Sequence, residues 1–272
     1  MDGSGWIFGV GLGVAVVAAI RGTWSPCGQS MLSSITPVTE TARGHRYRAT
    51  VGFFMVGAVA GGALVGAAAG LGSIVVGTVG PGAGTRTALL AVAALAGAVV
   101  DAGFAPWRTP FLRRQVNEDW LSGFRAWVYG GGFGFQIGTG VLTYVMTTAV
   151  FLAIAAAVLT GTAWQAVAVM TVFGLVRGSA IFLGAGAHSF PELQQLHRRL
   201  EAWREPIRRL TIGTLGAASV LWAVGAGAAA AVVVALAAIA VVLVVAARRA
   251  DRGTDPALVT PVRSRPVEPA LR

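Results

Sequence analysis

Long apolar stretches, separated by short polar segments, dominate the pattern of hydrophobic and polar positions. A helix needs about 20 consecutive apolar residues to cross the hydrocarbon core of a bilayer. Six stretches reach or approach this length: residues 6–22, 49–72, 85–104, 127–159, 163–187 and 210–247. The pattern therefore predicts an all-α integral membrane protein.

The last stretch is too long for one crossing. Its residues 210–247 would form a helix of roughly 57 Å, nearly twice the hydrocarbon thickness. We expect a hairpin with its turn at residues 225–227 and an extra helix at 228–247, which gives seven crossings. In the alternative, residues 210–247 cross once as a single, steeply tilted helix. The transmembrane domain then covers residues 1–248. Residues 249–272 contain four prolines and few large apolar residues, which predicts a disordered tail.

The connections differ in charge. Arginines gather in residues 39–48, 105–126 and 188–209, whereas residues 73–84 and 160–162 carry no charge. Basic loops face the cytoplasm, so the pattern predicts an outside N-terminus and a cytoplasmic C-terminus. The abundance of Ala, Gly, Val and Arg without Lys is typical of a GC-rich bacterial genome and indicates the bacterial inner membrane.

The connection at 188–209 also has the pattern of an amphipathic helix. Ser189 and Glu192 predict a capping box, and Pro206 is expected to end the helix. We expect this helix to lie in the membrane interface or to serve as an ordinary connector. Its apolar stripe consists of Leu193, Leu196, Leu200, Trp203, Ile207 and Leu210.

Composition excludes several classes of function. Hydrophobic residues make up 55% of the 272-residue chain and charged residues 12%, which excludes a cytosolic enzyme. The net charge of +10 comes from arginines between apolar stretches, so membrane lipid is the expected partner and nucleic acid is not. His45, His188 and His197 lack ligand spacing, so neither a metal nor another cofactor is predicted.

Two pairs of segments indicate an internal repeat. Residues 27–33 match residues 137–143, and residues 56–63 match residues 173–180, with glycines in register. The matches define two three-helix units, 5–104 and 127–226. Units with an odd number of crossings are inverted relative to each other and place a shared site near the bilayer midplane.

Each unit opens with a helix that small or helix-breaking residues interrupt. The first interruption is expected at residues 22–28, and the second at the glycines between 130 and 140. Non-helical backbone is tolerated in a membrane where it is buried in protein or lines a cavity. Two such interruptions predict a cavity between the repeats.

Ser25-Pro26-Cys27 at the first break, followed by Pro37 in an inverted repeat, resembles the DsbD/CcdA family of membrane thiol–disulfide electron carriers. The resemblance covers about residues 5–225. It implies that reducing equivalents pass from a thioredoxin-like protein to exported acceptors, including the proteins of cytochrome c biogenesis. It implies that Cys27 is a redox thiol. The family's second cysteine corresponds to Ile137, which follows Gln136. Since Cys27 is the one cysteine of the chain, a thiol cycle requires a partner thiol.

Arg177 is the most unusual charge, because it lies within an apolar stretch. Charged residues inside a bilayer usually face a cavity or a partner. We expect it to face the cavity; the alternatives are an Arg that reaches the interface and a structural pair with Asp101. Asp101 and Arg21 are expected nearer the interface. The predicted site comprises Cys27 as the catalytic residue and Pro26, Gly28, Gln136, Gly138 and Arg177 as substrate-binding residues.

Three classes of function remain open. A thiol-redox component would act through Cys27, and a transporter of a small solute, including an anion, would use the cavity and Arg177. A structural or assembly subunit would need neither residue, and Cys27 would then be a small packing residue.

Overall fold

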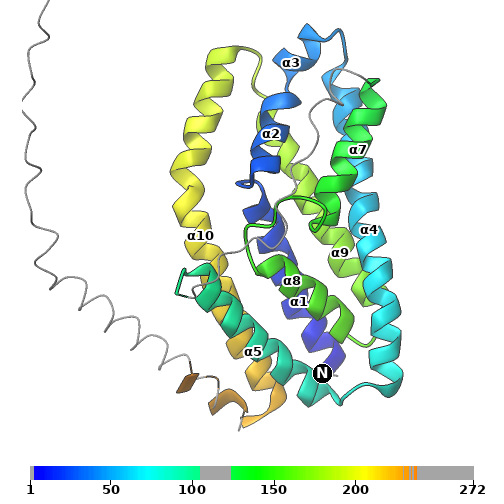
Figure 1. The fold of residues 1–272 in the computed structure, drawn as a ribbon, viewed down its shortest axis with the longest axis vertical. Helices are drawn as coiled ribbons and strands as arrows, with labels where there is room; N and C mark the ends of the chain where they lie inside the picture. The colour runs from blue at the N-terminus through cyan, green and yellow to red at the C-terminus, as the bar shows by residue number, and fades with distance from the viewer. Residues whose placement is uncertain (1–2, 105–123, 229, 233, 235, 238–272) are drawn as a thin grey trace, which may run out of the picture.

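The computed structural model describes residues 3–104, 124–228, 230–232, 234, 236 and 237 (Figure 1), and these residues contain helices and no strand. Five helical segments within these ranges, including α9 with the 3₁₀ turn that follows it, are long and apolar enough to cross a membrane. The predicted all-α multi-pass membrane fold is confirmed. The helices are α1 (Gly3–Gly22), α2 (Pro26–Ser34), α3 (Pro37–Ala42), α4 (Tyr47–Val79), α5 (Ala83–Asp101), α7 (Ala126–Thr139), α8 (Ala149–Leu159), α9 (Ala163–Ser179), the 3₁₀ turn Ala180–Gly184 and α10 (Phe190–Ala226).

The connections gather at two ends of the helical bundle. The N-terminus and the turn between α4 and α5 lie at one end, and α2 and α3 lie at the other (Figure 1). The Arg86 guanidinium donates to the Leu159 carbonyl at the first end, at 3.4 Å. At the second end the Val38 amide donates to the Ala187 carbonyl, at 3.2 Å. The uncharged connections 73–84 and 160–162 therefore lie at the same end of the bundle. The charge pattern of the sequence predicts both of them on one side of the membrane.

Glycines allow α4 to pack directly on the backbones of α7 and α9. A β-carbon on Gly57 would lie 2.1 Å from the Gly131 carbonyl oxygen, and one on Gly61 would lie 2.3 Å from that of Phe135. A β-carbon on Gly62 would lie 2.3 Å from the Met170 carbonyl oxygen of α9. Small residues permit this close approach of membrane helices, and α4 therefore packs closely on both α7 and α9.

The stretch 127–159, expected to form one interrupted crossing, forms two helices. The break begins at Gly140, whose φ is +72°, and ends where α8 begins at Ala149. The cluster Gly130–Gly134 stays helical, contrary to the expectation of a break there. Its glycines serve packing instead: a β-carbon on Gly134 would lie 2.0 Å from the Phe54 carbonyl oxygen of α4.

The expected helix at 188–209 is not separate, because α10 continues through Pro206 to Ala226. The predicted capping box of Ser189 and Glu192 is present at its start. Pro206 has no backbone N–H, so one carbonyl group in the preceding turn lacks its helical donor. Because residues 201–206 are exposed, this carbonyl group can be solvated. Beyond the proline, Arg208 donates to the Asp101 carbonyl of α5 at 3.0 Å. This contact fixes the continuing helix on the bundle.

Helix α10 ends where the hairpin turn is expected. Gly227 follows Ala226 with φ +116°, a conformation that favours glycine. Val234 then packs in the core. Most of the expected helix 228–247, all of the tail 249–272 and residues 105–123 of the second basic loop lie outside the described residues.

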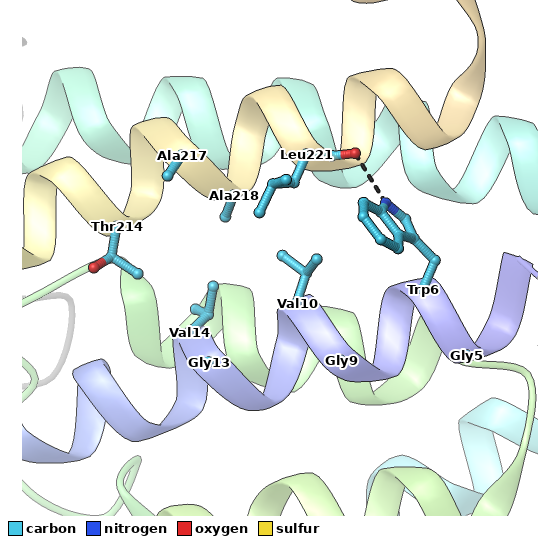
Figure 2. A pocket seen from close by; sticks show the side chains of 10 residues that line it. All are labelled: Gly5, Trp6, Gly9, Val10, Gly13, Val14, Thr214, Ala217, Ala218 and Leu221. Carbon is cyan, nitrogen blue, oxygen red and sulfur yellow. Dashed lines mark hydrogen bonds between the residues drawn. The ribbon is translucent and has the colours of Figure 1, made fainter. Parts of the chain in front are cut away.

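A groove of about 420 Å³ runs between α1 and α10 (Figure 2). Apolar side chains line it, including Val10, Val14 and Leu221, with Thr214 at one end of the set. The Trp6 indole donates to the Leu221 carbonyl at 2.9 Å and joins the two helices. The groove ends about two helical turns before the first break, so it is separate from the predicted site.

Candidate functional site at the two helix breaks

The first break lies between α1 and α2, at the position that the sequence indicates. Helix α1 ends at Gly22, and α2 begins at Pro26. Ser25 is the N-cap of α2, and its hydroxyl oxygen accepts the Gly28 amide at 3.1 Å. Cys27 follows on the first turn and is fully buried. The thiol therefore lies at the positive end of a short helix dipole.

The second break lies between α7 and α8. Gly140 opens it with a positive φ, and a β-carbon there would lie 2.7 Å from the Phe173 ring of α9. Thr143 lies within the break and is fully buried. The first break is enclosed in protein, and the second turns Thr143 inward while Leu142 is exposed.

Arg177 of α9 connects the two breaks. Its Nη2 lies 3.5 Å from the Ser25 hydroxyl of the first break and 3.4 Å from the Thr143 hydroxyl of the second. The side chain is 4% exposed. It interacts electrostatically with Cys27. The structure thus brings Arg177 and Cys27 together with two hydroxyl groups, one from each break.

Gly22 makes room for this arrangement. A β-carbon at Gly22 would lie 1.1 Å from Nη1 of Arg177, so any side chain there would displace the guanidinium. On another side, the guanidinium carbon lies 6.0 Å from the centre of the Phe173 ring. Backbone and ring together fix the position of the charge.

Asp101 is not the partner of Arg177. Its carboxylate accepts the Thr147 hydroxyl and the Thr148 amide, the latter at 3.1 Å, and so holds the end of the second break. Its electrostatic partner is Arg21. Arg21 lies in the last turn of α1 and is 6% exposed. The alternative pair of Arg177 with Asp101 is therefore wrong.

The remaining predicted site residues lie around the breaks in different roles. Pro26 is exposed, and Gln136 is half-buried. Gly28 packs against the first break, since a β-carbon there would lie 2.5 Å from the Thr23 carbonyl oxygen. Gly138 packs against α4, where the Ala58 carbonyl oxygen would be 2.0 Å from an added β-carbon. Neither glycine contributes a polar side chain to the group around Arg177.

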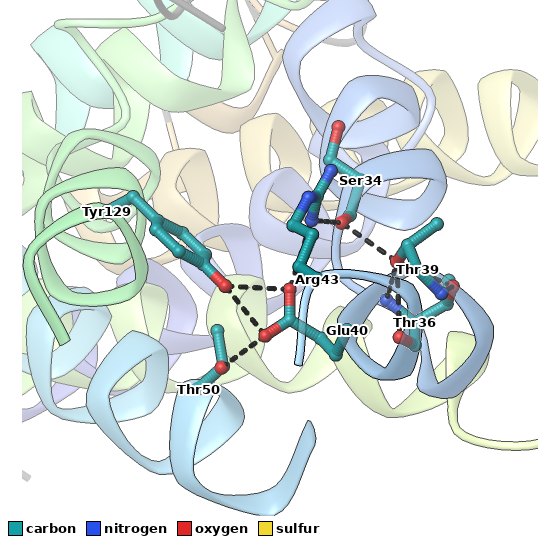
Figure 3. Close-up of polar contacts among 7 residues, drawn as sticks. All are labelled: Ser34, Thr36, Thr39, Glu40, Arg43, Thr50 and Tyr129. Carbon is teal, nitrogen blue, oxygen red and sulfur yellow. Dashed lines mark hydrogen bonds and ion pairs between the residues drawn. The ribbon is translucent and has the colours of Figure 1, made fainter. Parts of the chain in front are cut away.

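A buried carboxylate, Glu40, forms a second polar cluster that the sequence did not indicate (Figure 3). Glu40 is fully buried. The Tyr129 hydroxyl of α7 donates to both of its oxygens at 2.7 and 2.8 Å, and the Thr50 hydroxyl of α4 also donates. Arg43 forms an ion pair with it at 3.1 Å. Because these partners satisfy the carboxylate, the cluster fixes α3 on α4 and α7.

The chemistry available at the breaks is that of a thiol and a buried cation. Within the described ranges no group of three His, Cys, Asp or Glu side chains is placed to hold a metal ion. A thiolate is the reactive form of cysteine, and a nearby positive charge or helix N-terminus favours it. The arrangement can support thiol exchange at Cys27 or binding of an anion at Arg177.

No family model matches the chain, and no solved structure matches it. Curated relatives do. The methylamine utilization protein MauF of Paracoccus versutus is 37% identical over 172 residues, and the match spans 61% of each chain. MauF of Paracoccus denitrificans is 33% identical over 227 residues, 79% of this chain and 75% of the relative. MauF of Methylophilus methylotrophus is 33% identical over 168 residues, 60% of this chain and 58% of the relative. This multi-pass membrane protein therefore belongs to the MauF family.

Proposed function

We propose that this protein is a membrane component of methylamine utilization that exchanges thiols and disulfides through Cys27. The name of its MauF relatives supports the role in methylamine utilization. The role in thiol exchange rests on one observation: Cys27 lies in the first turn of the helix that follows a break, within the electrostatic influence of the buried Arg177. The proposal assigns Cys27 the role that the DsbD/CcdA resemblance implies, with a thioredoxin-like or other thiol protein as partner.

One cysteine can relay two electrons when the donor carries two thiols. The Cys27 thiolate attacks the disulfide of an acceptor, forms a mixed disulfide and releases one acceptor thiolate. A donor thiolate then attacks the Cys27 sulfur and releases the second acceptor thiolate. The second donor thiol displaces Cys27, so the donor leaves as a disulfide and the acceptor as a dithiol. The thiolates released from the acceptor take up the protons that the donor thiols lose.

Trapping in intact cells tests this relay. An acid quench with alkylation of wild-type cells, followed by non-reducing electrophoresis, is expected to show an adduct of higher mass that reductant abolishes. Cys27→Ser is expected to lose the adduct and to leave thiol proteins of the exported compartment more oxidised. A wild type without an adduct, together with an unchanged redox state in Cys27→Ser, would contradict the proposal.

A second candidate function is favoured by the position of Arg177. A cation that contacts both breaks is placed to bind a solute passing between two halves of a carrier. This function would be transport of a small anion and would not require Cys27. Flux of an anion into liposomes that is retained in Cys27→Ser and lost in Arg177→Gln would distinguish transport from thiol exchange.

We further propose that the two three-helix units form an inverted repeat. Two helix pairs that the repeat relates to each other are in contact, α4 with α9 and α5 with α10. In addition, α2, which carries residues 27–33, contacts α7, which carries residues 137–139. Such pairing of equivalent helices is what an axis between the units would produce. Cys27 and its counterpart Ile137 also lie in one hydrophobic cluster.

The variant Ile137→Cys tests the repeat. If the units are related as proposed, the new thiol faces Cys27, and mild oxidation is expected to join the two in a disulfide. The same substitution at Ile181, another buried member of that cluster, serves as the comparison. Mass spectrometry of peptides would identify the bond. Equal cross-linking at both positions would remove the support for the repeat.

The proposed orientation places the end with α2 and α3 in the cytoplasm of a bacterial cell and the N-terminus outside the inner membrane. The arginines of residues 39–48 lie at the former end, and the uncharged connections lie at the latter. A cytoplasmic thioredoxin-like donor would then approach Cys27 from the side of α2.

A further inference from the structure

The hydrogen bonds of Arg177 are incomplete. Its two bonds to the Ser25 and Thr143 hydroxyls measure 3.5 and 3.4 Å, whereas bonds from a guanidinium to an anion are about 2.7–2.9 Å. The Nε atom is buried and has no hydrogen-bond partner. A buried guanidinium with unused donors indicates a missing acceptor.

No carboxylate of the described residues pairs with Arg177, whose electrostatic partner is the thiol of Cys27. None of the ion pairs within the described part of the chain includes Arg177, and Asp101 is bound elsewhere. An unpaired charge at membrane depth is expensive. An acceptor that completes the site therefore has to be negatively charged.

The surrounding groups can receive an anion. The Ser25 oxygen accepts from both Gly28 and Arg177, so its own hydrogen remains available for a further acceptor. The Thr143 hydroxyl donates only a long bond, 3.5 Å to the Gly140 carbonyl. The first turn of α2 adds the positive end of a helix dipole. Because both hydroxyls lie near one nitrogen of Arg177, an acceptor that reaches all three groups would be an anion of few atoms.

We propose that Arg177, Ser25 and Thr143 form a binding site for a small monovalent anion of the carboxylate class. Arg177 supplies the charge, and one hydroxyl from each break donates to the ligand. The site is the one that the second candidate function would use, but binding itself requires neither transport nor Cys27. Occupancy would link the two breaks through the ligand.

Calorimetric titration of the full chain in detergent with sodium formate, at ionic strength held constant with sulfate, tests the site. Saturable binding is expected in the wild type. Arg177→Gln is expected to weaken it by at least about tenfold, because a hydrogen bond to a charged group is lost. Thr143→Val, which keeps the shape of the side chain, is expected to weaken it about fivefold.

Two matched variants make the result specific. Arg21→Gln removes another buried arginine that faces Asp101, and it is expected to leave formate binding unchanged. Arg177→Lys keeps the charge and is expected to retain weakened binding, which preserves the test if Arg177→Gln fails to fold. Equal binding in wild type and Arg177→Gln, or no saturable binding in the wild type, would overturn the site.

Cys27→Ser separates this site from thiol exchange. The proposed site predicts that Cys27→Ser binds formate as the wild type does, whether or not the variant forms mixed disulfides. Binding that occurs only in Cys27→Ser would mean that the Cys27 thiolate itself occupies the place of the anion. That outcome would overturn the anion site and leave the thiol relay standing.

Discussion

Gly57→Ala is expected to reduce folded protein sharply, whereas Gly52→Ala on the same helix is expected to fold normally. An added β-carbon at Gly57 would lie 2.1 Å from the Gly131 carbonyl oxygen of α7, and one at Gly52 would meet nothing within 4 Å. The obstacle at Gly57 is backbone, which cannot turn aside as a flexible side chain can. Overpacking of this kind costs about 1–3 kcal/mol, and we expect the upper part of that range.

The measurement is thermal unfolding of both variants in detergent, together with the fraction that elutes as a single species. Gly52→Ala should be at least as stable as the wild type, because alanine favours a helix over glycine by about 1 kcal/mol. A Gly57→Ala protein as stable as Gly52→Ala would show that α4 and α7 are not in backbone contact.

These glycines show which parts of the fold the sequence could predict. Gly57 and Gly61 are spaced four residues apart in an apolar stretch, and this spacing places them on one face of a helix. Close packing at that face is confirmed, because the pattern depends only on residues near one another in the sequence. Five of the six long apolar stretches overlap helices of membrane length among the described residues. These helices, the break at Ser25 and the end of α10 near Gly225 were predictable for the same reason.

The second break begins at Gly140, the last of the glycines at which it was expected, and the earlier glycines stay helical for a physical reason. Glycine both weakens an isolated helix and permits close helix packing, and a local pattern does not separate the two effects. In Gly130–Gly134 the packing on α4 dominates, since the Phe54 carbonyl occupies the space that a side chain would fill. The helix breaks only at Gly140, where φ becomes positive.

The candidate site was predictable in its charged residue but not in its partners. Arg177 is conspicuous because an arginine in an apolar stretch is rare. Its contact with Thr143 joins residues 34 positions apart, and its contact with Ser25 joins residues 152 positions apart. Neither separation leaves a periodic signal. Glu40 was missed because its partner Tyr129 is 89 residues away, and an acid among arginines in a connection gives no sign of burial.

Arg177→Met is expected to stabilise the protein while it abolishes the activity of the site. Replacing a buried charge that no carboxylate pairs with by an apolar side chain of similar volume removes a desolvation cost, and comparable replacements stabilise by about 1–4 kcal/mol. Methionine fits beside Gly22 and the Phe173 ring, which contact the arginine. Opposite changes in stability and activity are typical of residues that are retained for function.

Arg21→Met is the matched comparison, and its stability is expected to change in the opposite direction. Arg21 is buried to a similar degree, with 6% exposed against 4% for Arg177, but it has an acidic electrostatic partner in Asp101. Its removal leaves the Asp101 carboxylate without that counter-charge beside the second break, which is destabilising. Thermal unfolding of both variants in the same detergent measures the difference. If both substitutions lower the unfolding temperature, the charge of Arg177 is compensated within the protein, and the empty acceptor position that defines the anion site does not exist.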